Sequence, residues 1–225
     1  MNLRQPVFGL LLTGVLFERA YMEPKTEFSP IDFTIDPADI AGSFTRIADE
    51  LMNRRKLRVG PEQYRLAEIE FYYRSEVHPD EYIHAHELQL EKGRWYFHGS
   101  GLDITFGDGH SYGGILIRAV HKISDRTYVY GPLRCITEFF GNLPSVYESE
   151  CVIGLVEAAP GEFVAERPVA APRVGLNPAK DKGHYGAFYR YLIMPRRMHA
   201  EKYRIAEAMR QQGGYSEEEI KLVCG

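Results

Sequence analysis

The sequence predicts one α+β domain. The chain has 225 residues, enough for one large core or two small ones. Strand-like runs separated by glycines fill its middle, whereas helical periodicity is restricted to one stretch near the start, one short central segment and the tail. There is no internal repeat, low-complexity segment or long linker, so a single domain over residues 1–225 is expected.

Composition limits the functional classes. The net charge is −4 and the pI about 6.1, so the chain lacks the overall positive field typical of nucleic-acid-binding proteins, and any DNA contact would depend on local basic patches. Cys135, Cys151 and Cys224 are widely spaced without a C-x-x-C pair, which favours a reducing compartment and therefore a cytoplasmic protein.

The N-terminal region contains an apolar run over residues 7–17. It is shorter than the roughly 20 residues that cross a bilayer, and no small-residue cleavage site follows it. A buried N-terminal element is therefore expected in place of a membrane anchor, followed by a connector over residues 21–35.

The first helix is expected over residues 35–57. Asp36 is placed to cap it and Pro37 suits the first helical position, while apolar residues recur at helical spacing from Ile40 to Leu51. Its basic end, "MNRRKLR", is expected to be a solvated helix terminus, or alternatively a phosphate-binding patch, and Gly60 ends the helix.

The middle of the chain alternates strand and turn signals. Strands are expected within residues 64–73, 87–99, 102–107, 113–123, 126–131, 150–158 and 185–193, with a turn at "GDG". Helices are expected at 132–141 and 196–214, a last helical turn follows with Ser216 and Glu219 spaced as a capping box, and a proline-rich loop covers 167–183.

One candidate site is a histidine cluster. Six of the eight histidines lie between positions 78 and 121. His84 and His86, on a strand, would point to the same side, and with Glu91 they form an H-x-H-x4-E pattern that resembles the first motif of the cupin family. The second cupin motif has no counterpart, so divalent-metal binding stays an alternative beside ordinary hydrogen-bonded histidines.

A second candidate is the strand "AEIEFYY". Alternation places Glu68, Glu70 and Tyr72 on one face. A carboxylate beside an aromatic ring could activate water next to a stacked planar ligand, although the same pattern is also that of a solvent-exposed strand face.

The order of several motifs resembles the alkyladenine (3-methyladenine) DNA glycosylase family. "AEIEFYY" followed by "DEYIHA" is similar to its E-x-E-x-Y and D-E-x-x-H stretch, and "GDGHSYGGILIRAV" to its G-D-G and L-L-R-A strand. "YGPLRCITEFFG" and "APRVGLNPAKDKGHYGAFYRYLI" resemble later motifs, and "DPADIAGSFTRIADELMNRR" its opening helix. The resemblance covers residues 36–193, leaves 1–35 and 195–225 as extra terminal segments, and implies a curved, mainly antiparallel sheet flanked by helices.

The resemblance also implies site residues. Glu70 aligns with the general base that activates water, and Arg118 with an arginine near that water and the phosphate. Tyr72 and His84 align with rings that sandwich a flipped-out base. The remaining positions are His98, at a third stacking position, Asp103, where the family has an asparagine that discriminates among purines, and Arg134 and Arg173 as phosphate contacts.

The sequence departs from the family in three respects. "GRWYFHGSGLDITFG" connects two strands directly and lacks the hairpin that carries a wedge tyrosine in the family. Asp103 would accept a hydrogen bond from an exocyclic amine and reject a lone pair. The acidic net charge does not favour tracking along a phosphate backbone.

The expected function is therefore that of a monofunctional DNA N-glycosylase that hydrolyses the bond to an alkylated or deaminated purine. It would act as a monomer on double- or single-stranded DNA, associated with the nucleoid, without cofactor, metal or membrane. The alternatives are a nucleoside or nucleotide N-glycoside hydrolase, a non-catalytic nucleobase-binding relative, and the H-x-H metal protein.

Overall fold

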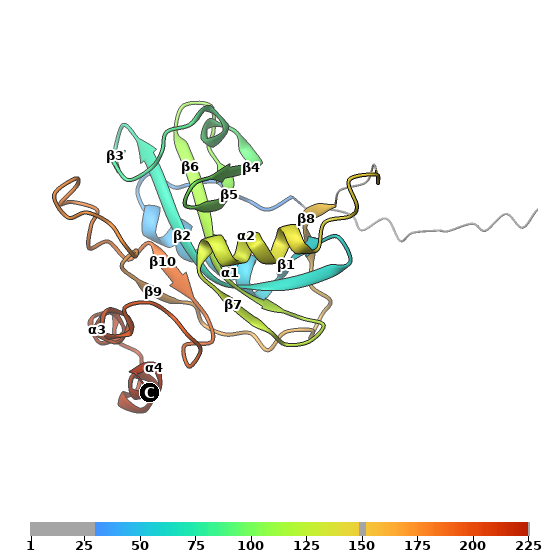
Figure 1. The fold of residues 1–225 in the computed structure, drawn as a ribbon. Helices are drawn as coiled ribbons and strands as arrows, with labels where there is room; N and C mark the ends of the chain where they lie inside the picture. Colours follow the sequence, from blue (N-terminus) through green and yellow to red (C-terminus); the bar gives the residue numbers. More distant parts are fainter. Residues whose placement is uncertain (1–29, 149–151, 225) are drawn as a thin grey trace, which may run out of the picture.

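A curled antiparallel sheet with flanking helices forms the molecule (Figure 1), which confirms the predicted α+β fold. The structure, a computed structural model, describes residues 30–148 and 152–224. Its helices are α1 (Ile40–Asn53), η1 (Glu87–Leu90), α2 (Pro132–Gly141), α3 (Lys202–Gln212) and α4 (Glu217–Cys224). Its strands are β1 (Arg55–Val59), β2 (Glu62–Ser75), β3 (His78–Pro79), β4 (Lys92–His98), β5 (Gly101–Phe106), β6 (Tyr112–Lys122), β7 (Tyr128–Tyr130), β8 (Ile153–Glu157), β9 (Val169–Ala171) and β10 (Arg190–Leu192).

The long strands β2 and β6 form the centre of the sheet. The main order is β4-β5-β6-β2-β1-β8, with β10 paired to β2 and β9 to β10. Figure 1 shows α2 across the front of this sheet, and α3 and α4 together beyond β9 and β10. Residues 64–71 of β2 are buried, so the polar side chains among them must find partners within the protein.

Aromatic side chains build the core on one side of β2. Phe44 of α1 stacks on Phe71 at a ring-centroid distance of 4.5 Å, and Tyr191 meets Phe71 edge-on at 5.4 Å. Since neighbouring residues of a strand point to opposite sides, packing Phe71 into this core directs Glu70 and Tyr72 to the other side.

An irregularity in the β2–β6 ladder lies beside those carboxylates. Glu68 pairs with Ala119 and Ile69 pairs with Ile117, so Arg118 has no direct partner across the ladder. A bulge of this kind bends the strand and redirects a side chain. Here it accompanies the turning of the Arg118 guanidinium toward Glu68 and Glu70.

The predicted first helix is shorter than expected. It begins after Asp39, whose carboxylate accepts from Gly42 N at 2.8 Å, and it ends before Arg55. The basic stretch continues as strand β1, in which Arg55 binds Glu50 and Lys56 binds Glu162. The sequence predicts that "MNRRKLR" is a solvated helix end or a phosphate patch. Both predictions are wrong for Arg55 and Lys56, which are buried and form ion pairs within the protein.

The C-terminal tail is an integral part of the fold. The predicted capping box is confirmed, because Glu219 N donates to Ser216 Oγ and Ser216 N donates back to the Glu219 carboxylate. Residues of α3 and α4 form a second apolar cluster with β9 and β10. The tail is therefore packed against the region that resembles the glycosylase family.

Some expectations fall outside the described residues, namely the apolar N-terminal run and Cys151. Among the helices that the structure describes, none combines the length and apolar character required to cross a bilayer. Cys135 is buried and Cys224 is exposed, and both are free thiols.

Candidate functional site

A small pocket opens where β2, β5 and β6 meet the loop after β9. Its volume is about 210 Å³. Five residues predicted from the sequence lie together in its wall, namely Tyr72, His84, His98, Asp103 and Arg118. The other lining residues are Tyr82, Gln89, Ser100, Leu116, Pro132, Val174, Gly175 and Leu176.

Strand pairing fixes the spacing of two carboxylates around this pocket. Asp103 lies opposite Leu116, and Leu116 lies opposite Glu70. Directly paired residues point to the same side of a sheet, and neighbouring strands are about 4.8 Å apart. The backbones at Asp103 and Glu70 are therefore about 10 Å apart, with Leu116 between them as an apolar floor.

Glu70 is fully buried directly behind the pocket wall. One carboxylate oxygen accepts from Val174 N at 2.7 Å, and the other accepts from the Tyr72 hydroxyl at 2.9 Å and from Arg118 at 3.3 Å. All three donors belong to residues that line the pocket. A ligand or water in the pocket therefore reaches Glu70 through Tyr72 and Arg118.

Glu68 completes a buried charge network under the site. Arg118 Nε donates to Glu68 at 2.9 Å, while its Nη1 binds Glu70, so one guanidinium bridges both carboxylates. His199 Nδ1 binds the second Glu68 oxygen, and Arg190 lies 3.7 Å from the first. His199 comes from the segment before α3, so the C-terminal tail contributes directly to this network.

The surroundings hold these groups in defined protonation states. Burial opposes ionisation of Glu68, yet the hydrogen bond from His199 and the charges of Arg118 and Arg190 hold its pKa below the ordinary value. Burial and the adjacent Glu70 carboxylate raise the pKa of Tyr72 well above the usual range. The Tyr72 hydroxyl therefore stays protonated and donates a hydrogen bond to Glu70.

Aromatic and imidazole rings form the outer part of the pocket. The His84 and His98 rings are 4.4 Å apart and nearly perpendicular. Burial and the neighbouring His98 lower the pKa of His84, so at neutral pH His84 is an uncharged ring. An uncharged ring is compatible with the stacking role that the family resemblance implies for His84.

Tyr72 has one free ring face at most. The Arg173 guanidinium lies 4.6 Å from its ring centroid, so the cation already occupies one face. Stacking of a ligand on Tyr72 is thus restricted to the pocket side.

The two predicted phosphate contacts differ in accessibility. Arg134 is exposed on α2. Arg173 has no exposed surface and binds Asp80 through two nitrogens, at 2.6 and 3.2 Å. The expectation that Arg173 meets phosphate therefore needs correction: this buried pair ties the loop after β3 to the strand β9 region.

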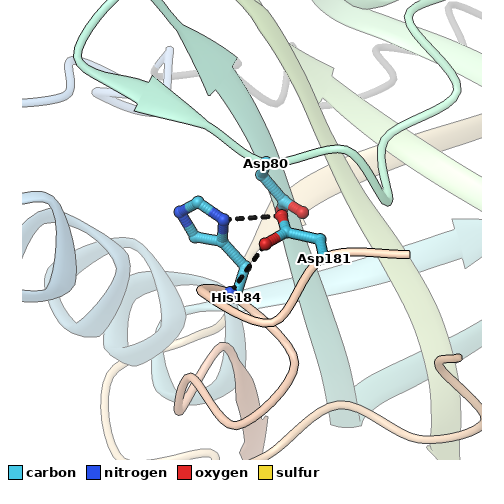
Figure 2. Close-up of side chains that lie close together, drawn as sticks. All are labelled: Asp80, Asp181 and His184. Carbon is cyan, nitrogen blue, oxygen red and sulfur yellow. Dashed lines mark hydrogen bonds and ion pairs between the residues drawn. The ribbon is translucent and has the colours of Figure 1, made fainter. Parts of the chain in front are cut away.

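The metal alternative has a different geometry from that expected. His84 and His86 lie in a loop, not on a strand, and His86 caps η1 by accepting from Leu88 N. Within residues 30–148 and 152–224, the only trio of possible ligands within reach of one ion is Asp80, Asp181 and His184 (Figure 2).

Existing partners occupy that trio. Both Asp80 oxygens accept from Arg173. Although burial opposes it, hydrogen bonds from Glu81 N and from His184 lower the pKa of Asp181 to about 2. A guanidinium in contact with Asp80 would repel a metal ion, so these residues are best explained as a loop-stabilising cluster.

Sequence reasoning missed several residues of the site. Asp80 and Val174 lie within motifs that resemble the glycosylase family, but the resemblance implies no functional role for either residue. Glu68 was placed on the correct face, but nothing in a single sequence pairs it with His199, which is 131 positions away. Gln89 and Ser100 carry no pattern that marks them.

Comparison with known proteins assigns no family. No family model matches the chain. A similar protein is an uncharacterized protein of Acanthamoeba polyphaga mimivirus, 33% identical over 119 residues, which correspond to 42% of this chain and 55% of the viral protein. The chain thus spans about half the length of the curated relative it matches, and that relative carries no activity in its name.

We expect Asp80→Asn to lower the free energy of unfolding by about 3 kcal/mol, because it leaves the buried Arg173 charge without a counterion. Urea unfolding followed by circular dichroism measures this. Asp32→Asn, which removes an exposed partner of Arg46, is the matched control and should change little. Equal effects of the two substitutions would contradict the structural role of the buried pair.

Glu68→Gln should destabilise the protein in a pH-dependent manner. Because the folded-state pKa of Glu68 lies below its ordinary value of 4.5, its ionised form contributes stability above that pH, and the contribution is lost as pH falls through the folded-state pKa. The difference in unfolding free energy between wild type and variant should therefore be largest at neutral pH and shrink below pH 4.5. Exposed Glu76→Gln is the control, and a difference independent of pH would contradict the charge network.

Proposed function

We propose that this chain is an N-glycoside hydrolase of the DNA base-excision type, with Glu70 as general base. The observation that supports the proposal is the position of Glu70 directly behind a pocket small enough for one nucleobase. Its volume of about 210 Å³ is below the roughly 300–1,000 Å³ typical of pockets for drug-sized ligands. The motif resemblance points to the same residues.

The chemistry assigns a role to each buried group. Water attacks the anomeric carbon of the sugar as the carbon–nitrogen bond breaks, and the electron pair leaves with the base. The proton from water passes to Glu70, with the Tyr72 hydroxyl as the relay between pocket and carboxylate. Glu70 and Glu68 stabilise the oxocarbenium charge that develops on the sugar.

Arg118 positions the general base, Glu70, for the abstraction of the proton. Its guanidinium compensates the charge of Glu70 inside the protein, and by bridging Glu68 it holds the carboxylate in a fixed position. Glu70 is thereby positioned as the proton acceptor at a site that solvent does not reach.

The surface beside the pocket supports a polymer as substrate. Three exposed apolar side chains, called the apolar rim below, lie on elements that also carry pocket-lining residues. They are Phe97 on β4, which carries His98, and Leu133 and Phe140 on α2, which carries Pro132, with exposed fractions of 59%, 55% and 62%. The rings of Phe97 and Phe140 are 6.1 Å apart. We infer that these exposed rings stack the unpaired bases that flank an extruded one.

A second candidate is a hydrolase of free nucleosides. The burial of Arg173 favours it, because it removes one of the two cations expected to hold phosphate, and the chain is acidic overall. A nucleoside hydrolase requires the pocket and Glu70, but it requires neither the apolar rim nor cationic side chains that contact the phosphates of a DNA backbone.

Glu70→Gln should abolish base release, because it removes the proton acceptor while preserving size and most hydrogen bonds. General-base catalysis contributes about 10²–10⁴-fold, so we expect a loss of at least about 100-fold. The measurement is chromatographic release of free base from single- and double-stranded oligonucleotides that contain 7-methylguanine or hypoxanthine, and from the corresponding nucleosides.

Exposed Glu91→Gln is the control for that experiment and should retain wild-type rates. Release from nucleosides alone would favour the second candidate. Full activity of Glu70→Gln, or no release by wild type from any of these substrates, would contradict the proposed function.

Phe97→Ala should separate polymer from nucleoside substrates. Loss of one stacking contact of about 1–3 kcal/mol should raise KM for single-stranded DNA roughly 5- to 150-fold and leave nucleoside hydrolysis unchanged. Steady-state kinetics on both substrates measure this. Val164→Ala, which also truncates an exposed apolar side chain, is the control, and equal KM values for Phe97→Ala and wild type would rule out a contribution of the rim.

A further inference from the structure

We propose that Asp103 makes this pocket select purines that carry an exocyclic amino group, through a hydrogen bond from that amine to the Asp103 carboxylate. The inference rests on the proposed nucleobase pocket and adds the class of base that it accepts. It is carried by the hydrogen bonds around Asp103, which lines the pocket and is 2% exposed.

The tautomer of His98 follows from its partners. Ser100 N donates to His98 Nδ1 at 3.2 Å, so Nδ1 carries a lone pair and no proton. The ring proton is therefore on Nε2, which lies 3.0 Å from Asp103 Oδ1. His98 is thus a neutral ring that donates to Asp103.

The orientation of Gln89 is fixed in the same way. Its Oε1 accepts from His86 N at 3.1 Å, so its Nε2 is the atom that faces Asp103 Oδ2, at 3.2 Å. Gly114 leaves room for this contact, because a Cβ there would lie 2.6 Å from Asp103 Oδ2. Both oxygens of Asp103 thus accept hydrogen bonds, the pattern of an ionised carboxylate.

This charge lacks a cationic partner in the part of the chain that the structure describes. The only ion pair that involves Asp103 is with His98, which is neutral. A buried carboxylate with neutral donors alone retains unused acceptor capacity and gains from a further donor. The pocket side of Asp103 is where a ligand can supply it.

The spacing of the site assigns that donor to the base and not to the sugar. In the proposed reaction the anomeric carbon lies near Glu70, and Asp103 is two strands away, across Leu116. The far edge of a purine therefore faces Asp103. An amino group there donates to the carboxylate, whereas an edge that offers a lone pair meets a second lone pair and is repelled.

Two nucleoside pairs that differ in one amino group test the proposal. Isothermal titration of the full-length protein with guanosine against inosine, and with adenosine against purine riboside, measures the contribution of that group. We expect the amino-bearing member of each pair to bind at least about tenfold more tightly, as hydrogen bonds to charged groups do.

Asp103→Asn should remove this preference, and Asp108→Asn, an exposed aspartate on the turn between β5 and β6, should retain it. Equal affinities within both pairs for wild type, or no binding of any of the four nucleosides at millimolar concentration, would overturn the proposal even if Asp103→Asn failed to fold. A folded Asp103→Asn variant that kept the preference would also overturn it.

Base release assayed in the same samples tests the hydrolase activity independently of the amino-group selectivity. Amino preference without release of base from any nucleic acid or nucleoside would uphold the selectivity and contradict the hydrolase. Release without amino preference would uphold the hydrolase and contradict the role of Asp103.

Discussion

The bridge that Arg118 forms between Glu68 and Glu70 is the interaction on which the site depends. Two carboxylates on the same side of one strand, both fully buried, would repel each other and lose their hydration. Arg118 compensates both through separate nitrogens, Arg190 supplies further positive charge, and His199 contributes a hydrogen bond to Glu68. Without this network, β2 could not bring these carboxylates into the sheet.

The fold contains several devices that serve this arrangement. The ladder irregularity at Arg118 accompanies its approach to both glutamates, and the loop after β9 brings Val174 N to Glu70. The Asp80–Arg173 pair holds that same loop in place from behind. The result is a pocket with the Glu70 carboxylate buried behind one end and, across Leu116, the Asp103 carboxylate held by neutral donors at the other. Such asymmetry suits a ligand whose reacting bond and whose recognition edge lie at opposite ends.

The sequence predicted much of the fold because local signals and tertiary structure agree. Helix α2 has the predicted bounds, the Ser216 capping box forms, and the alternation in β2 places Glu70 and Tyr72 on one face. The prediction that the first helix extends to residue 57 is wrong, because residues 55–59 form strand β1. The basic stretch looked like a helix end, but pairing with β2 and β8 and ion pairs with Glu50 and Glu162 stabilise it as a strand.

The candidate site was predictable only in part. The order of the motifs led to five of the lining residues: four of them lie on strands β2, β4, β5 and β6, which are near one another in the chain, and His84 lies in the loop before η1. Long-range partners could not be inferred in that way, as the contact between Glu68 and His199 illustrates. For Arg173 the motif resemblance implies a phosphate contact, whereas in the structure its charge balances that of buried Asp80.

Both the proposed hydrolysis and the proposed base selectivity require a nucleobase to lie over Leu116, between Glu70 and Asp103. The most direct test is a crystal structure of the Glu70→Gln variant with a single-stranded oligonucleotide that contains 7-methylguanine. We expect the modified base to occupy the pocket, with its glycosidic bond toward residue 70 and its amino group within hydrogen-bonding distance of Asp103. An oligonucleotide bound elsewhere with this pocket free of base, or a base in the reverse orientation, would contradict it.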